Sequence, residues 1–388
     1  MMTVDKNLII HYKEDYKSTM IQRITDNYQK NRNSIKKKCN INEFINKTTI
    51  INNNMEINTE IIGDLLVGEI NDLKKKYQWI NDYVQLTYFC NEWPQFRDYY
   101  KWKFEYDNSN KNNKLKDIRK KYLELGSYEV VRKEYSSKYV YDNIVRNQKS
   151  FDALIKIIKE DLKKFNEIIE LIYTYNLMSS DIKNKIKKEY KTEVCIYCNR
   201  QFISSWENDN NNKIITADLD HILPNSVFPL LALNINNLVP VCLVCNRFIK
   251  LDRVLSTWNP FTLGFNDNTY FSTENHQTVE SIIGADTLFD IRLRVKKGLR
   301  KETEELLEKT IWFYKFNELY SSHKEYVRTL LEKKHIYTPE IVDEIYGLIN
   351  LKCESKRELE LLLFGISKAD EELDNKILGK LSKDILWN

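Results

Sequence analysis

The stretch that decides the fold begins at Cys195-Ile196-Tyr197-Cys198 and ends at Cys242-Leu243-Val244-Cys245-Asn246. The 43 residues between the two pairs include Asp218-Leu219-Asp220-His221-Ile222-Leu223-Pro224 and Asn236-Asn237-Leu238-Val239-Pro240. Two Cys-x-x-Cys pairs supply four thiolates, which complete a tetrahedral zinc site and leave no open position. We therefore predict a structural Zn²⁺ bound by Cys195, Cys198, Cys242 and Cys245.

Three further cysteines, Cys39, Cys90 and Cys353, stand singly in the chain. A secreted disulfide scaffold would be shorter and richer in cysteine. A thioredoxin-type redox pair would not occur twice. The pattern favours one metal site and three idle or buried thiols.

The bulk composition indicates a globular protein of two or three units, since 388 residues exceed one typical domain. No apolar run approaches the roughly 18 residues that a membrane span needs, and residues 1–6 lack the layout of a signal peptide. We expect a soluble, cytoplasmic protein with no membrane contact. The net charge is only +4, so charge alone does not indicate a nucleic-acid binder. Basic runs such as 183–191 are read as solvated helix faces unless they gather around a site.

Helical periodicity dominates both ends of the chain. Apolar residues recur at three- and four-residue steps over 148–176, and Ser179-Ser180-Asp181 is typical of the start of a basic helix over 181–190. An earlier apolar stripe, from Leu65 to Val84, is expected to break at Pro94 because proline disrupts helices. Helical patterns return from about residue 299, and Pro339 begins another helix.

The middle of the chain has a different composition, because four of the six prolines fall between residues 224 and 260. Two strands are predicted there, 200–206 and 213–222, followed by a helix from Asn246 to about Arg253. Short strands are also expected at 269–272 and 288–295. The expected fold is mainly α with a small central α+β module. We divide it into a helical N-terminal region (1–189), the central module (190–262), and a C-terminal region of short strands and then helices (263–388).

Asp220 and His221 carry the chemistry that we expect in the central module. A neutral imidazole can take a proton from water near neutral pH, which suits a general base. The adjacent carboxylate can hold a hard divalent cation beside a phosphate. An isolated Asp-His pair has little meaning, but this one ends an apolar strand between two cysteine pairs.

Two asparagines complete the candidate site. Asn246 follows the fourth cysteine and can offer its amide oxygen to the same cation, although a helix N-cap is the alternative. Asn237 can hydrogen bond the loop that carries His221, or it can be an ordinary turn residue. Lys250, one helical turn beyond Asn246, can meet a phosphate or lie on the surface.

These residues carry a family resemblance. The run from Asp218 to Ser226, followed by Asn237 and by Asn246-Arg247 with Lys250, resembles the HNH nuclease motif of the ββα-metal fold. It is notably similar to the version in the HNH domain of CRISPR RNA-guided DNA nucleases, whose third motif position is also Asn. The cysteines, with Phe228-Pro229, resemble the zinc-stapled subtype of bacterial anti-phage HNH nucleases that accompany Septu ATPases or retrons.

The resemblance spans about residues 190–262 and implies a role for each site residue. His221 would be the general base, Asp220 and Asn246 ligands of a catalytic Mg²⁺ or Mn²⁺, and Asn237 the middle HNH position. Asn246 in place of the usual histidine favours an oxygen-liganded magnesium ion. The implied activity is metal-dependent hydrolysis of phosphodiester bonds in DNA, in anti-phage defence or restriction.

Two alternatives stay open. The motif does not distinguish DNA from RNA or tRNA, and a zinc module can also be catalytically idle and only bind nucleic acid or a partner protein. The chain has no G-x-x-x-x-G-K-[ST] signature, so any nucleotide-driven gating would need a partner ATPase or other defence-system protein.

Overall fold

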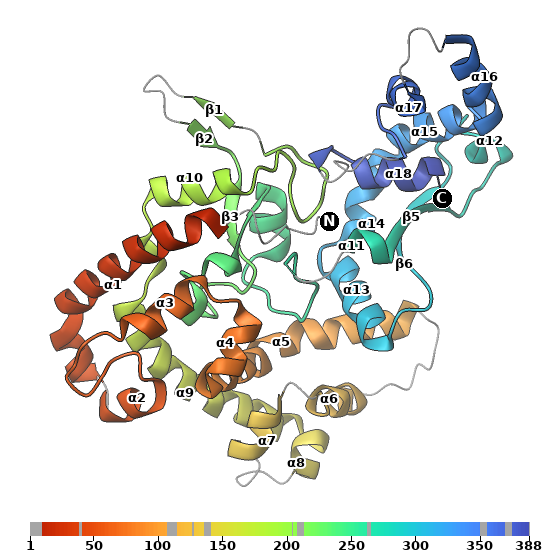
Figure 1. The fold of residues 1–388 in the computed structure, drawn as a ribbon. Helices are drawn as coiled ribbons and strands as arrows, with labels where there is room; N and C mark the ends of the chain where they lie inside the picture. Colours follow the sequence, from red (N-terminus) through yellow and green to blue (C-terminus); the bar gives the residue numbers. More distant parts are fainter. Residues whose placement is uncertain are drawn as a thin grey trace.

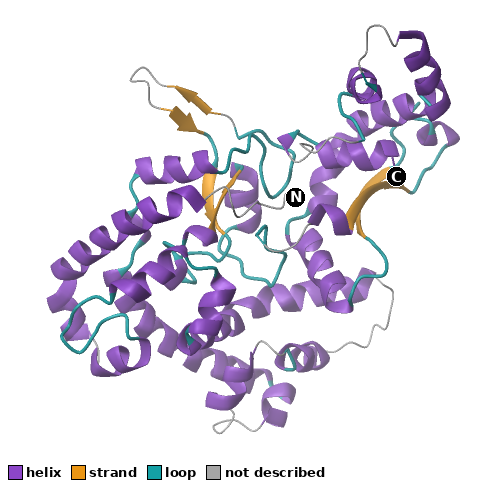
Figure 2. Cartoon of the chain, in the orientation of Figure 1, coloured by secondary structure: helices purple, strands orange, loops and turns teal. Residues whose placement is uncertain are grey.

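A computed structural model gives the arrangement of the chain. It describes residues 10–38, 41–106, 115–125, 128–135, 141–203, 205–207, 213–261, 265–349, 355–368 and 375–387. Within these ranges the chain is mostly helical, with three separate two-stranded sheets (Figures 1 and 2). The predicted fold class, mainly α with a small central α+β part, is confirmed.

Helices make up the N-terminal region. They are α1 Ile10–Lys38, α2 Ile41–Thr48, α3 Thr59–Val67, α4 Ile70–Lys76, α5 Gln78–Tyr106, α6 Leu115–Leu123, α7 Glu129–Tyr135, α8 Tyr141–Arg146, α9 Gln148–Ile172, the 3-10 helix η4 Tyr175–Leu177, and α10 Ser180–Glu189. The helices predicted over 148–176 and 181–190 are confirmed as α9 and α10. The buried stripe of α9, which includes Phe151, Leu154 and Ile158, packs on α1 and α5 because its apolar side chains share one helix face.

The expected break at Pro94 is wrong, because α5 continues through it to Tyr106. A proline inside a helix removes one backbone hydrogen bond and costs about 3 kcal/mol or more. Phe89, Trp93 and Phe96 surround Pro94 in sequence and are all buried in the core. Burial of a large apolar side chain contributes about 1.5–3 kcal/mol, so packing on both sides of Pro94 outweighs its cost.

The central segment contains the short strands. Its elements are β1 Ser205–Glu207, β2 Lys213–Ile215, β3 Asp218–His221, the 3-10 helices η5 Pro229–Leu231 and η6 Ile235–Asn237, β4 Leu238–Val241, and the π-helix η7 Val244–Lys250. Strand β3 pairs antiparallel with β4, with Asp220 opposite Val239 and His221 opposite Leu238. The chain order β3, β4, η7 is therefore a ββα unit.

The strands expected at 200–206 and 213–222 are only partly correct. The first begins as late as Ser205, and the second is divided into β2, which pairs with β1, and β3, which pairs with β4. Residues 208–212, between β1 and β2, lie outside the described residues.

The C-terminal region begins with a hairpin and ends in helices. Its elements are α11 Phe265–Asn268, β5 Thr269–Glu274, α12 Val279–Ile282, β6 Asp290–Val295, α13 Lys301–Phe313, α14 Phe316–Tyr320, the 3-10 helix η8 Ser321–His323, α15 Lys324–Ile336, α16 Pro339–Ile349, α17 Lys356–Phe364 and α18 Gly379–Trp387. The strands predicted near 269–272 and 288–295 are confirmed as β5 and β6, which pair antiparallel.

Both flanks hold the central segment, which lies between them in Figure 1. The hydroxyl of Tyr16 in α1 donates to the Leu233 carbonyl (2.6 Å), and the Asn234 amide donates to Leu65 (2.7 Å) in α3. One buried apolar cluster includes side chains from all three sequence regions. The division at residues 189 and 262 stays a prediction.

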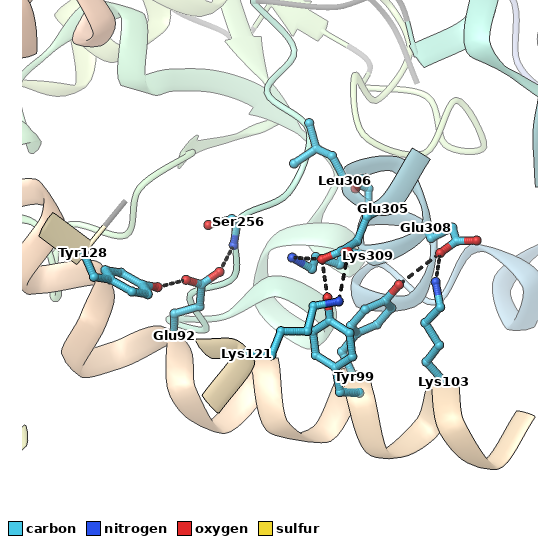
Figure 3. Close-up of polar contacts among 12 residues, drawn as sticks. Glu92, Tyr99, Lys103, Lys121, Tyr128, Ser256, Glu305, Leu306, Glu308 and Lys309 are labelled. Carbon is cyan, nitrogen blue, oxygen red and sulfur yellow. Dashed lines mark hydrogen bonds and ion pairs between the residues drawn. The ribbon is translucent and has the colours of Figure 1, made fainter. Parts of the chain in front are cut away.

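The two flanks also contact each other directly. Figure 3 shows α5 facing α13, where the Tyr99 hydroxyl of α5 donates to Glu308 of α13 at 3.2 Å, and Lys121 of α6 pairs with Glu305 of α13 at 3.2 Å. Glu92 of α5 accepts from the Ser256 amide at 2.6 Å, just after the central ββα unit. These polar contacts join the N-terminal helices to the C-terminal region and to the segment that follows the ββα unit. None of the described helices is long and apolar enough to cross a membrane.

Candidate active site and metal centre

The four paired cysteines gather at one point. Their sulfur atoms all lie within 4.8 Å of one another, and all four side chains are buried. The Cys242 amide donates to the Cys195 sulfur at 3.3 Å, and the Cys245 amide donates to the Cys242 sulfur at 3.5 Å. Hydrogen bonds from the neighbouring sulfurs lower the pKa of Cys242. Four buried sulfurs at this spacing fit a tetrahedral zinc ion.

Of the three single cysteines, the structure describes Cys90, which does not join this cluster. Cys90 is buried in α5, with its sulfur 3.8 Å from the Ile155 carbonyl. Cys39 and Cys353 lie outside the described residues.

The C-terminal region braces the first cysteine pair. The Tyr320 hydroxyl donates to the Cys198 carbonyl at 2.6 Å, and the Leu378 amide donates to the Asn199 carbonyl at 2.7 Å. Asn199 adopts a positive φ of 51°, which turns the chain directly after Cys198 and which Asn tolerates better than most residues. The cysteine cluster therefore links the central segment to its C-terminal flank.

The second feature is a cavity of 360 Å³ beside the ββα unit. It is lined by Tyr175, Leu219, Asp220, His221, Pro224, Asn225, Asn246, Arg247, Lys250, Leu251 and Asp252. The structure thus brings Asp220, His221 and Asn246 to one open space, although β3 and η7 are far apart in sequence. Lys250 also lines this cavity.

His221 is held in one orientation. Its Nε2 lies 2.8 Å from the Ala232 carbonyl, and because a carbonyl only accepts, Nε2 carries the proton and Nδ1 is the basic nitrogen. The Tyr175 ring meets the imidazole edge-to-face, with centroids 4.6 Å apart. Burial lowers the pKa of His221 to about 4, helped by the charges of Lys250 and Lys183. The imidazole is therefore neutral at neutral pH.

Asp220 is engaged by two partners in this structure. The Lys250 ammonium lies 3.0 Å from Oδ1, and the Tyr197 hydroxyl donates to Oδ2 at 2.6 Å. Lys250 also donates to the His221 carbonyl. Burial raises the pKa of Asp220, although Lys250 and Tyr197 act to lower it. A cation that binds Asp220 has to replace or share these contacts.

Asp218 anchors Asn246 from the same side of β3 as Asp220, because alternate residues of a strand share a face. The Asn246 amide donates to Asp218 at 3.0 Å, and Arg247 contacts both Asp218 oxygens at 2.7 and 2.8 Å. Burial acts to raise the pKa of Asp218, but the bonds from Arg247 and Asn246 lower it overall. Because its nitrogen donates to Asp218, the amide oxygen of Asn246 is the atom that could accept a cation.

Asn237 is fully buried and ties the loop after β3 to the start of β4. Its amide donates to the carbonyls of Leu223 and Leu231, both at 3.0 Å, and its Oδ1 accepts from the Leu223 amide at 2.8 Å. These bonds fix the chain on both sides of the turn that follows His221. Asn237 does not line the cavity, so its contacts are those of a positioning residue.

Sequence reasoning missed several residues that shape the site. Asp218 could have been found from strand alternation, since it lies two residues before Asp220. Tyr175, Lys183 and Tyr197 carry no sequence signal, because only the fold brings them beside β3. A carboxylate and an amide oxygen at one open cavity are the hard donors that Mg²⁺ or Mn²⁺ prefers, so the residues fit a divalent cation once Lys250 moves aside.

Comparison with known proteins agrees with this geometry. The family model of the HNH endonuclease matches residues 195–249, which span both cysteine pairs, β3, β4 and nearly all of η7. No curated protein and no solved structure matches the chain. Residues 195–249 are therefore an HNH endonuclease domain, and its four cysteines form a cluster suited to a zinc ion.

Proposed function

We propose that the protein is a metal-dependent endonuclease that hydrolyses phosphodiester bonds in DNA, with His221 as the general base. The observation that carries this proposal is the orientation of His221. Its Nε2 is fixed on the Ala232 carbonyl, and its ring lines the same cavity as Asp220 and Asn246. A neutral imidazole with a free Nδ1 beside two oxygen donors is suited to removing a proton from water.

The reaction then follows from the chain's own groups. His221 takes the proton of a water through Nδ1, while the Ala232 carbonyl holds the opposite nitrogen and stabilises the resulting imidazolium. Asp220 and Asn246 would hold the Mg²⁺ or Mn²⁺, which supplies positive charge to the phosphate and to the leaving oxygen. Asn237 keeps the loop after His221 in place. In-line attack of this water on phosphorus would break the P–O3′ bond, which leaves a 5′-phosphate and a 3′-hydroxyl that takes its proton from solvent.

Lys250 has a second role in this proposal. As the partner of a buried carboxylate, it supplies the positive charge that Asp220 requires when no cation is bound. When a cation takes that position, the ammonium is repelled into the cavity, where it can contact a substrate phosphate. The same side chain therefore serves first Asp220 and then the substrate.

A role in anti-phage defence or restriction is part of the proposal. It rests on the resemblance of the cysteine pairs and the Asn-type third position to anti-phage HNH nucleases. Phage challenge of cells that express the chain, alone and with its neighbouring genes, tests this role. Equal plaque numbers for the wild type and His221→Ala in every combination would argue against it.

The activity itself is tested on purified protein with MgCl₂. Supercoiled plasmid, single-stranded DNA and tRNA are offered in parallel to the wild type, His221→Ala and a control, His335→Ala, which changes an exposed histidine of α15. We expect nicking of plasmid by the wild type and the control, and a rate at least about 100-fold lower for His221→Ala.

Three outcomes decide between the functions. Cleavage of tRNA but not DNA would replace the DNA assignment with an RNA nuclease. Equal cleavage by His221→Ala would remove His221 as the base. Binding without cleavage by any variant, with partner proteins supplied, would indicate an idle zinc module.

A further inference from the structure

A segment before the HNH domain reaches into its cavity. Tyr175 belongs to η4 and Lys183 to α10, and both precede the first residue of the family match, Cys195. Tyr175 nevertheless lines the cavity that contains Asp220 and His221. The cleavage site is therefore larger than the HNH domain.

The two side chains pack one after the other against His221, the proposed general base. The Lys183 ammonium lies 4.0 Å from the centre of the Tyr175 ring, and the Tyr175 ring meets His221 at an interplanar angle of 71°. One aromatic ring thus separates a cation from the imidazole that is proposed to accept a proton. A cation over a ring face is held electrostatically, but the ring uses none of its three N–H donors.

Lys183 differs from the next lysines of α10. No carboxylate of the described residues lies within ion-pair distance of Lys183, whereas Lys185 is 3.9 Å from Asp15. Lys183 is half-buried, and burial lowers its pKa. Lys188 lies on the exposed side of the same helix. A half-buried ammonium with unused donors, held on a ring that lines the cavity, favours an anion as its partner.

We propose that Lys183, supported on the Tyr175 ring, is a phosphate-binding site for the nucleic-acid strand next to the scissile bond, and that Tyr175 positions the His221 ring. This inference deepens the proposed nuclease function and rests on it. The phosphate would bridge the HNH domain and α10, so the N-terminal region takes a direct part in holding the substrate.

The phosphate contact is tested by binding without cleavage. Each variant is made in the His221→Ala background, and the affinity for a short fluorescein-labelled DNA duplex and for its single strand is measured over a series of salt concentrations. We expect Lys183→Gln to weaken binding several-fold and to reduce the salt dependence by about one released counterion. Lys188→Gln, the matched control, is expected to leave both unchanged.

The position of Tyr175 is tested by rescue. Tyr175→Phe keeps the ring and removes only the hydroxyl, whereas Tyr175→Leu removes the ring. We expect Tyr175→Phe to cleave plasmid at nearly the wild-type rate, and Tyr175→Leu to lose about tenfold or more in kcat, since misorientation of a base acts on the chemical step. KM for Tyr175→Leu should change less than kcat, and its melting temperature should stay close to that of Tyr175→Phe.

The outcomes separate this inference from the nuclease proposal. Equal binding and equal salt dependence for Lys183→Gln and Lys188→Gln would overturn the phosphate site even if the wild type cleaves DNA. A salt response confined to Lys183→Gln would support it even if no cleavage were found. Parallel losses in Tyr175→Phe and Tyr175→Leu would overturn the positioning role of the ring.

Discussion

The HNH domain holds two candidate metal centres that differ in nearly every physical property. The cysteine centre is closed: four buried sulfurs lie within 4.8 Å of one another, and the Leu378 amide and the Tyr320 hydroxyl of the C-terminal region brace it. The Asp220 centre opens into a cavity of 360 Å³ and offers oxygen and nitrogen groups. The proposed ligands already have protein partners, namely Lys250 and Tyr197 on Asp220, and Asp218 on Asn246.

This contrast indicates a different role for each centre. Soft thiolates in a closed site bind zinc tightly and support folding. Hard oxygen donors in an open site, each with a protein partner that can be exchanged, suit a cation that arrives with the substrate. Perturbing the first centre should therefore change stability, and perturbing the second should change activity.

The largest effect is expected at the cysteine centre. Cys242→Ala should abolish zinc binding and lower the melting temperature by roughly 10 °C or more, because the metal supplies folding free energy that no other contact replaces. Zinc content is measured by elemental analysis and stability by calorimetry. Cys90→Ala, which removes a buried thiol outside the cluster, should keep its full zinc content. Retention of zinc by Cys242→Ala would contradict the assignment of the four cysteines as the zinc site.

Asn246→Ala should produce the opposite pattern. Loss of its amide oxygen should lower the plasmid-cleavage rate by about 100-fold, with unchanged zinc content and a melting temperature within a few degrees of the wild type. The control is Asn53→Ala, an exposed loop position far from β3 in sequence. A large drop in melting temperature without an activity change would assign Asn246 to the fold instead.

Lys250→Met tests whether the lysine competes with a cation at the open centre. The substitution keeps an unbranched side chain, one atom shorter, but removes the positive charge that lies 3.0 Å from Asp220. We expect the Kd for Mn²⁺ at pH 8 to fall by on the order of tenfold, since the cation no longer competes with an ammonium. Isothermal titration on zinc-loaded protein measures this. Weaker Mn²⁺ binding by Lys250→Met would show that the lysine assists the cation.

The smallest expected effect concerns the stability of the helical scaffold at acidic pH, at a residue outside both centres. Burial acts to raise the pKa of Glu305, but Lys309, Tyr100 and Lys121 lower it to about 2, from 4.5. A carboxyl whose folded pKa is depressed contributes stability above its unfolded pKa and loses it as the pH falls. This part of the stability should therefore disappear between pH 4.5 and about 2.

Urea denaturation across this pH range measures the loss, with zinc content followed in parallel. Glu305→Gln should flatten the acid response of the helical scaffold, whereas Glu302→Gln, an exposed position on the same helix, should not. An acid response that follows zinc release in both variants would place acid sensitivity at the cysteine centre alone.

Local patterns in the sequence predicted the parts of the molecule that depend on spacing. The paired cysteines, the long amphipathic helix α9 and the β5–β6 hairpin all follow from periodicities that survive in the fold. Pro94 was misread because its helix propensity is outweighed by buried neighbours from elsewhere in the chain. Contacts between distant segments could not be predicted in this way. No local pattern links Tyr175 to His221, and the ion pair of Lys250 with Asp220 depends on how η7 packs on β3.

The most direct test of the two-centre account is a titration of zinc-loaded protein with Mn²⁺, followed by electron paramagnetic resonance. The wild type, Asp220→Asn and His221→Ala are compared, each with its zinc content measured before and after. The account predicts one Mn²⁺ site in the wild type and in His221→Ala, its loss in Asp220→Asn, and constant zinc in all three. Mn²⁺ binding that survives Asp220→Asn, or that displaces the zinc, would contradict it.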